Sequence, residues 1–195
     1  VGWGENSRQQ LITALHQALQ KPDKQKRRHT LDIVADTSPV IGQPAIDFLL
    51  EVAQTEKDVW VRGRAIHALG KVPSTNQRVF EVLTAALLDT NRVARHGAAL
   101  GLKRIGVRSE SVSTALLTAL QTQDTQLRRY AADALARCGQ QNTTTFSLLE
   151  AALSDTDELV CLNVAVALLR LGAQSTRAQE TLVTLLQSEN IEVRR

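Results

Sequence analysis

Four histidines are the side chains in this sequence best suited to bind a metal ion or transfer a proton near neutral pH. They are His16, His29, His67 and His96, and they are dispersed along the chain without His-Glu pairs. No Ser-His-Asp set, glycine-rich phosphate loop or CxxC cluster accompanies them. The sequence therefore predicts a protein that is not an enzyme, with no catalytic residues, no metal site and no cofactor.

Arginine recurs in one column of the chain at intervals of 33 residues. The column consists of Arg62, Arg95, Arg128 and Arg194, with Cys161 in place of one arginine. Short polar residues precede it by four positions at Asp58, Asn91, Asp124 and Asp157. Because guanidinium–carboxylate contacts are charge-assisted and directional, we expect the two columns to form a structural ladder between successive repeats. Ligand binding by these arginines is the alternative.

A second basic column contains Lys71, Arg104, Arg137 and Arg170. Each of these residues falls in the last turn of an expected helix, where a cation gains about 0.3–1 kcal/mol from the exposed carbonyls and the helix dipole. We interpret the column as a helix-end feature. A stripe that meets an acidic partner is the alternative.

Charge is concentrated in residues 21–29, which hold five basic residues against one acidic residue, while the whole chain carries +3. Nucleic-acid binding normally uses a broad basic face and often aromatic stacking. Aromatic residues make up only 3% of the chain. The sequence therefore argues against a nucleic acid as the partner.

Composition and cysteine usage indicate a cytoplasmic protein. The 195 residues are 43% hydrophobic and 22% charged, with no apolar run near the roughly 18 residues of a membrane span and no secretory signal at the start. Cys138 and Cys161 occupy opposite ends of equivalent helices, so we expect two free thiols and a reducing compartment. The chain contains no Met and stops inside a repeat, and we interpret it as a piece of a longer protein.

Two helices are expected in each 33-residue repeat. Polar N-caps precede both helices, and Pro73, Gly106, Gly139 and Gly172 end the second one. The expected helices span residues 7–20, 23–35, 44–55, 59–71, 77–88, 92–104, 110–121, 125–137, 143–153, 158–171 and 176–187. Pro39, Gly42 and Pro44 should break the chain after the first pair, and no stretch alternates with the period of a strand.

These patterns predict an all-α protein, an α-solenoid superhelix of about five and a half helical hairpins in a single domain, residues 1–195. The repeats are expected at residues 7–37, 42–73, 76–106, 109–139, 142–172 and, truncated, 175–195.

The motif V-R-x-x-A-x-x-A-L-x-x-h-G carries a family resemblance. It occurs as Val61-Arg62 with Ala65 and Ala68-Leu69, and again in residues 127–139. It resembles HEAT repeats of the short type associated with phycobilisome lyases, and it excludes ankyrin repeats, whose T-P-L-H-x-A motif is absent. The resemblance implies that the second helix of each repeat lines a concave side, and that the protein is a binding or scaffolding module.

One helix, residues 158–171, is apolar all round. Leu162, Val166 and Leu169 lie opposite its core side, where other repeats carry polar or small residues, including His67, His96 and Arg129. We predict that these six residues belong to a partner-binding surface for another protein or peptide, most simply an amphipathic helix. The alternative for the three aliphatic residues is that a C-terminal part of the longer parent chain covers them. The expected function is a protein-interaction scaffold. A bilin chromophore lyase or isomerase subunit and a nucleic-acid-binding solenoid remain alternatives, and the oligomeric state stays open.

Overall fold

The computed structural model describes residues 4–72 and 76–194, and within them it contains twelve helices and no strand. The chain divides into two compact units, Val1–Ile105 and Gly106–Arg195. The first unit contains α1 (Glu5–Leu19), α2 (Lys24–Ile41), α3 (Gln43–Thr55), α4 (Val59–Lys71), α5 (Gln77–Ala86) and α6 (Arg92–Ile105). The second unit contains α7 (Glu110–Ala119), α8 (Thr125–Cys138), α9 (Thr143–Ala152), α10 (Glu158–Arg170), α11 (Thr176–Leu185) and α12 (Ile191–Arg194).

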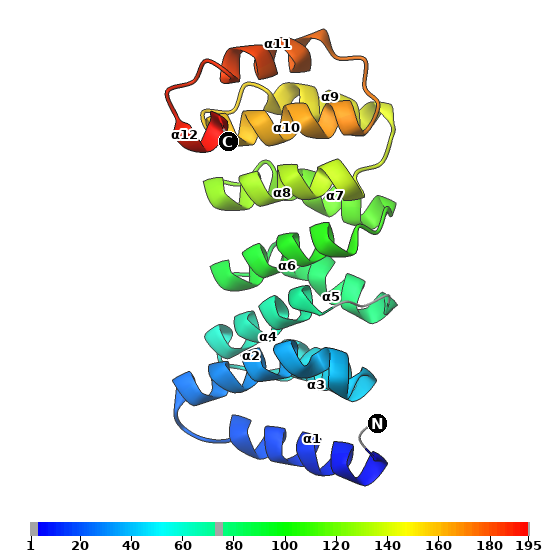
Figure 1. Cartoon of the computed structure of the whole chain (residues 1–195), viewed down its shortest axis with the longest axis vertical. Helices are drawn as coiled ribbons and strands as arrows, with labels where there is room; N and C mark the ends of the chain where they lie inside the picture. The colour runs from blue at the N-terminus through cyan, green and yellow to red at the C-terminus, as the bar shows by residue number, and fades with distance from the viewer. Residues whose placement is uncertain (1–3, 73–75, 195) are drawn as a thin grey trace. The chain divides into compact units, whose positions relative to one another are not determined.

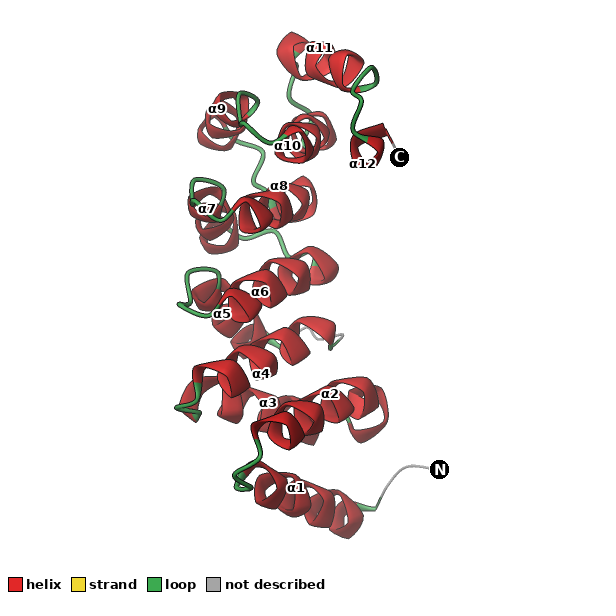
Figure 2. Cartoon of the chain, turned by 90° about the vertical axis from the view of Figure 1, so that its left-hand side faces the viewer, coloured by secondary structure: helices red, strands yellow, loops and turns green. Residues whose placement is uncertain are grey.

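Each unit is a stack of helical hairpins, which confirms the predicted α-solenoid architecture (Figure 1). Within each unit the first helices of the hairpins form one layer and the second helices another (Figure 2). The layers enclose leucines that recur at the repeat period. In the first unit these include Leu69 and Leu83, and in the second Leu116, Leu135 and Leu149, all without exposed surface.

The predicted N-caps are confirmed. Asp58 accepts hydrogen bonds from the backbone of Trp60 and Val61, and the other second helices begin in the same way at Asn91, Asp124 and Asp157. The first helices of the later repeats begin at Asn76, Ser109, Asn142 and Ser175, each with its side chain accepting from the first turn. These short-range bonds explain why the expected and observed helices start within about two residues of one another.

The expected break at Pro39 is wrong, because α2 continues through it to Ile41. Pro39 has no N–H to donate to the carbonyl of Ala35. The Ser38 hydroxyl donates to that carbonyl instead, at 2.8 Å. The helix ends at Ile41 and is followed by Gly42, whose φ of 78° favours glycine.

The glycines that follow the second helices have two different roles. Gly106 and Gly172 have φ values of 72° and 84°, as expected for left-handed helix ends. Gly139 also follows the end of its helix, α8, but its φ of −65° is not left-handed. A Cβ on Gly139 would lie 2.6 Å from the Leu135 carbonyl oxygen, and close packing therefore explains this glycine. Pro73 lies outside the described residues.

Second helices pack against one another more closely than first helices do. In the first unit, a Cβ on Gly70 of α4 would lie 2.5 Å from the Gly97 oxygen of α6, so these two backbones are nearly in contact. In the second unit, α8 packs along α10, whereas α7 and α9 meet only briefly. We use the term second-helix face for the solvent side of α2, α4 and α6 in the first unit, and of α8 and α10 in the second.

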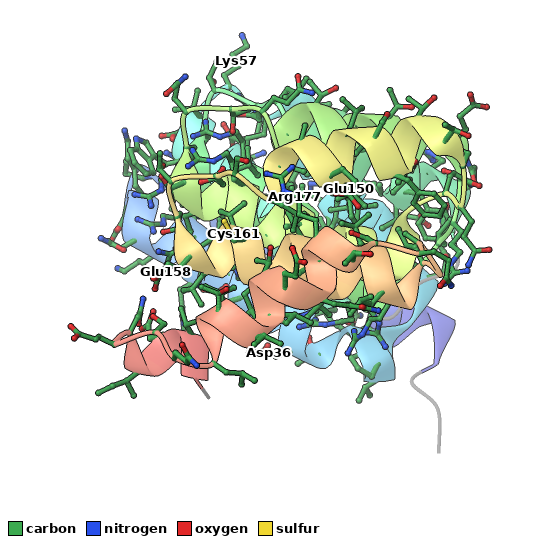
Figure 3. The ribbon with its side chains drawn as sticks, turned by 90° about the horizontal axis from the view of Figure 1, so that it is seen from above. Asp36, Lys57, Glu150, Glu158, Cys161 and Arg177 are labelled. Carbon is green, nitrogen blue, oxygen red and sulfur yellow. The ribbon has the colours of Figure 1, made fainter. Side chains whose placement is uncertain are left out.

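First helices are linked by polar contacts at their ends. Figure 3 shows Arg177 of α11 beside Glu150 of α9, and its guanidinium donates to the Glu150 carbonyl oxygen at 3.0 Å. The same guanidinium also donates to the Ser154 hydroxyl. The Glu150 carbonyl also accepts from the backbone N–H of Leu153, so Arg177 adds a second donor in the last turn of α9 and attaches α11 to that helix.

Candidate functional site

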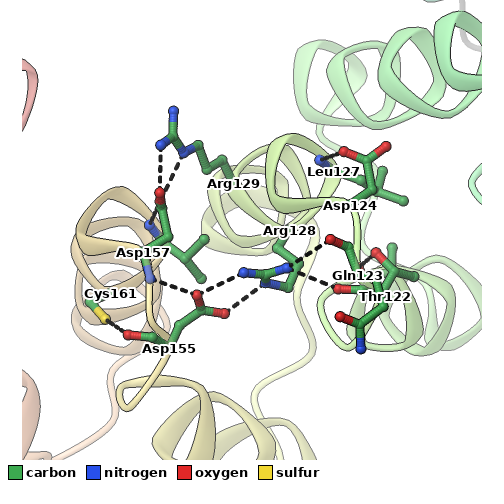
Figure 4. A network of polar contacts seen from close by, with 11 residues as sticks. Thr122, Gln123, Asp124, Leu127, Arg128, Arg129, Asp155, Asp157 and Cys161 are labelled. Carbon is green, nitrogen blue, oxygen red and sulfur yellow. Dashed lines mark hydrogen bonds and ion pairs between the residues drawn. The ribbon is translucent and has the colours of Figure 1, made fainter.

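The predicted arginine ladder has its strongest rung in the second unit, between α8 and the loop before α10 (Figure 4). Arg128 Nε and Nη2 donate to the two oxygens of Asp155 at 2.7 and 2.9 Å. The remaining Nη1 donates to the carbonyls of Thr122 and Gln123. Arg128 therefore connects two successive repeats as well as the two ends of its own loop. Its pKa is raised by the hydrogen bond to Asp155.

The partners in this ladder differ from those that the sequence predicted. Arg62 donates to Asp89 at 3.3 Å through both Nε and Nη2, and Asp89 lies two residues before the cap Asn91. Asp155 likewise lies two residues before the cap Asp157. The expectation that the column pairs with the caps is therefore wrong for Arg62 and Arg128. The caps Asp58 and Asp157 do accept from arginines, but these are Arg27 and Arg129, which lie outside the column. The column arginines instead meet the residue two positions before the cap.

The sequence contained a signal for these partners. Glu56, Asp89 and Asp155 fall in one column at the repeat period, with Thr122 between the last two. Glu56 extends the ladder to α2, because its carboxylate lies 3.7 Å from Arg27. Each acid also accepts from the backbone N–H two residues later, as Asp89 does from Asn91 at 2.7 Å. The recurrence of acidic residues two positions before the N-caps could therefore have indicated the partners of the arginine column.

Two members of the arginine column differ from the others. Arg95 donates from Nη1 to the carbonyls of Asp89 and Thr90, which closes its own loop. Cys161 replaces the arginine in α10, and its thiol donates to the Asp155 carbonyl at 3.2 Å. The side chain of Arg194 lies outside the part of the chain whose side chains are described.

Arg129, predicted to contact a partner, is engaged within the second unit. Its Nε donates to Asp157 Oδ1 at 2.8 Å, and Nη2 donates to the other carboxylate oxygen (Figure 4). The hydrogen bond from Arg129 holds the pKa of Asp157 below its usual range. Asp157 therefore has two roles, because it is also the N-cap of α10.

In the first unit the second-helix face carries a polar cluster centred on His67 of α4. Arg64 Nη2 donates to Asp32 Oδ2 of α2 at 2.6 Å. Asp32 Oδ1, Arg64 Nε and His67 Nδ1 are buried atoms without a hydrogen-bond partner among the described residues. Burial and the nearby charges of Arg64 and Lys71 lower the pKa of His67, so this imidazole is neutral at pH 7.

The basic column lies at the end of the same face. Arg104 of α6 donates from Nη1 to the Gly70 carbonyl in the last turn of α4, at 3.3 Å. This contact agrees with the expected helix-end role, although it reaches the neighbouring helix. Lys71 is half-buried, and in the second unit Arg137 and Arg170 are exposed. His96, the other histidine predicted for the binding surface, is half-buried on α6.

The aliphatic stripe of α10, which consists of Leu162, Val166 and Leu169, is only partly exposed to solvent. Leu162 packs against a small cluster of Cys161, Leu185 and Val193, which comes from α10, α11 and α12. Val166 is half-buried, whereas Leu169 is 37% exposed. The stripe thus begins under the last repeat and opens to solvent toward the end of α10.

Neither cysteine is arranged for catalysis. Cys138 and Cys161 are buried, and neither forms a disulfide. Burial raises the pKa of Cys138 to about 11 and raises the pKa of Cys161 as well. Because the thiolate is the reactive form, both cysteines are poor nucleophiles at neutral pH.

The described residues contain no cluster of three or more His, Cys, Asp or Glu side chains that could hold a metal ion. None of the described helices has the length and apolar character needed to cross a membrane. The second-helix faces carry paired and half-buried polar groups, such as Arg129 and His67, beside aliphatic side chains such as Leu169.

Comparison with solved structures shows the same architecture elsewhere. An engineered protein is similar over 94% of this chain and 92% of its own, with a TM-score of 0.68 and 21% identity. The complex of CpcE and CpcF of phycocyanin lyase from Nostoc sp. PCC7120 gives a TM-score of 0.72 at 21% identity, covering 94% of this chain and 73% of that one. A designed armadillo repeat protein in complex with the peptide (KR)4 gives 0.65 at 19% identity, with coverages of 94% and 95%. At these identities the likeness establishes the fold alone.

A search of curated protein sequences gave no significant match. The family model described as HEAT repeats matches residues 12–103 and 113–195, which together make up most of the chain. The repeat period, the capped helical hairpins and this match agree, and the chain belongs to the HEAT repeat family.

Proposed function

We propose that this chain is a non-enzymatic protein-interaction scaffold that binds a protein or peptide on its second-helix faces. The binding residues would include His67 and His96 in the first unit. In the second unit they would include Arg129, Leu162, Val166 and Leu169. The two buried cysteines, which form no disulfide, support a reducing, cytoplasmic setting for this role.

The observation that carries the proposal is the incompletely satisfied polar cluster on the first unit. Buried polar atoms normally have hydrogen-bond partners, and a group of exceptions on one surface calls for an explanation. Asp32 Oδ1, Arg64 Nε and His67 Nδ1 lie on adjacent helices of the same face. A bound segment that reorients these side chains would supply the missing hydrogen bonds. The designed armadillo protein, which is shown with a bound peptide, has the same fold and supports this mode of use.

The test is to select peptides from a random display library against the whole chain and to map the best binder by NMR. We expect chemical-shift changes on the second helices, and loss of binding in His67→Ala. The matched control is Glu81→Ala, which alters an exposed residue on the first helix α5. If the selected peptides shift residues of α5 and α9 instead, the second-helix faces are not the binding surface.

The fold likeness to phycocyanin lyase keeps a role as a bilin lyase or isomerase subunit as the second candidate. Mixing the chain with a bilin and its acceptor protein would produce a new visible absorbance band if that candidate were right. A nucleic-acid-binding solenoid would instead show affinity that falls steeply as salt rises.

A further inference from the structure

Grooves lie between successive first helices at equivalent positions in the two units. In the first unit a groove of about 340 Å³ lies between α3 and α5, and in the second a groove of about 270 Å³ lies between α7 and α9. Lining residues of the two grooves correspond at twice the repeat period, as Val82 and Leu148, Ala85 and Ala151, Ala86 and Ala152, and Asp89 and Asp155. The groove is therefore a property of the repeat. We call the one in the second unit the α7–α9 groove.

The α7–α9 groove lies at the carboxyl ends of two helices. One wall is formed by the last turn of α7 and the residues after it, Leu117, Leu120 and Gln121. The other wall is formed by the second half of α9 and the residues that follow it. Figure 2 shows α7 and α9 as neighbours in one layer. Because the carboxyl end of a helix carries a partial negative charge, both helices favour a cation in this groove.

Two cations border the groove, and each has a carboxylate beside it. Asp155, which lines the groove, is paired with Arg128 of α8. Arg177 of α11 donates to the hydroxyl of Ser154 at the rim and lies beside Glu150 (Figure 3). The second unit as a whole has 10 acidic against 8 basic residues, a formal charge of −2. The helix ends and this acidic excess therefore give the groove a field that attracts cations.

Arg177 shows how an arginine fits the last turn of a first helix. Its guanidinium donates to the Glu150 carbonyl oxygen at 3.0 Å and to the Ser154 hydroxyl. One repeat earlier, these acceptors correspond to Leu117 and Gln121, and both residues line the α7–α9 groove. A carbonyl oxygen has two lone pairs, so Leu117 can accept a guanidinium N–H as well as a backbone one, as Glu150 does.

The chain supplies no arginine at the corresponding position of α9. The residue equivalent to Arg177 is Thr144, which is exposed and does not line the groove. The walls contain the apolar side chains of Leu148 and Ala151, and acceptors lie at the rim. An arginine matches this arrangement, because its methylene stem is apolar and its planar head carries several donors.

We propose that the α7–α9 groove binds an arginine side chain of a partner protein. The methylene stem packs against Leu148 and Ala151, and the guanidinium donates to the Leu117 carbonyl and to the side-chain oxygen of Gln121. The groove belongs to the layer of first helices, so it is an interaction surface separate from the second-helix faces. The first-unit groove is less suited, because the cationic Arg62 forms part of its wall.

The probe is N-acetyl-arginine amide, titrated into the whole chain at low salt and followed by NMR. We expect saturable chemical-shift changes at the ends of α7 and α9, with a dissociation constant on the order of 1 mM for so small a ligand. The citrulline analogue replaces the guanidinium by a neutral urea of the same shape. It should bind at least about fivefold more weakly, because hydrogen bonds from an ionised donor are roughly twice as strong.

Three variants locate the binding. Ala151→Phe fills the groove and should abolish the saturable changes. Its matched control, Thr143→Phe, adds the same ring to a residue of α9 that does not line the groove, and should bind the probe normally. Gln121→Leu removes one acceptor at similar size and should weaken binding about three- to tenfold. All three residues are exposed, so circular dichroism should show that the helices are retained.

Several results would overturn the inference. Equal binding of the arginine and citrulline amides, or normal binding in Ala151→Phe, would show that the groove does not recognise arginine. Shift changes confined to α3 and α5 would place the site in the first unit instead. If the same resonances shift when the chain alone is diluted, a second copy fills the groove and a separate partner protein is wrong. These outcomes leave the proposed function intact, because the second-helix faces are tested with library-selected peptides.

Discussion

The rung between Arg128 and Asp155 should contribute measurably to the stability of the second unit. Both side chains are only 12% exposed, and two charge-assisted hydrogen bonds of 2.7 and 2.9 Å join them. Exposed ion pairs are worth about 0.2–1 kcal/mol, whereas breaking a buried pair costs about 3–5 kcal/mol. Asp155 would keep one backbone donor, the N–H of Asp157, after the loss of Arg128. We therefore expect Arg128→Met to cost about 2–3 kcal/mol, between these two limits.

A double-mutant cycle separates the pair from its surroundings. The variants are Arg128→Met, Asp155→Asn and the combination, and urea unfolding is followed by circular dichroism. We expect a coupling energy of about 1–2 kcal/mol. Hydrogen exchange resolved by helix should show the loss of protection in α8 and α10, the two helices that the rung connects.

The matched comparison is the equivalent rung in the first unit. Arg62 and Asp89 are joined at 3.3 Å and are 22% and 15% exposed, so their coupling energy should be smaller. A coupling below about 0.5 kcal/mol for Arg128 and Asp155 would refute the reasoning that these rungs hold successive repeats together. A larger coupling for Arg62 and Asp89 would show that distance and burial do not rank the rungs.

Three further predictions concern pH, the core and close packing. Asp157→Asn preserves the helix cap but removes the ion pair with Arg129. Since the folded pKa of Asp157 lies below the unfolded value of 3.8, the difference in unfolding free energy between wild type and variant should be full above about pH 5 and should shrink as the pH falls through the lowered folded pKa; a pH-independent difference in urea unfolding would contradict this. Leu135→Ala should cost about 2–5 kcal/mol and raise hydrogen exchange in neighbouring repeats as well as in α8, because repeats are held by their neighbours; exchange confined to α8 would argue against a cooperative stack. Gly97→Ala places a Cβ 2.5 Å from the His67 Cα and should lower the melting temperature, whereas Gly4→Ala, with open space around it, should not; equal melting points would show that α4 and α6 can separate at no cost.

The sequence by itself determined the repeat period, the helices and their caps. These features depend on contacts within about four residues, such as Asp58 accepting from Val61, and on apolar periodicity that places Leu69 and Leu135 in the core. For that reason α4 has the predicted bounds, residues 59–71, and the other second helices from α6 to α10 agree within about one residue. Local chemistry carries this information, so no knowledge of distant segments was needed.

Only the tertiary structure decided which groups meet between repeats. Arg62 pairs with Asp89 rather than with Asn91 because of the separation of two helices that are about 30 residues apart in sequence. The helix α2 continues through Pro39 because the Ser38 hydroxyl donates to the Ala35 carbonyl, to which proline has no N–H to donate. Likewise, the partial covering of Leu162 requires α11 and α12 to be in place. Periodicity predicts the face on which a side chain lies, whereas its partner depends on three-dimensional distances that no local pattern encodes.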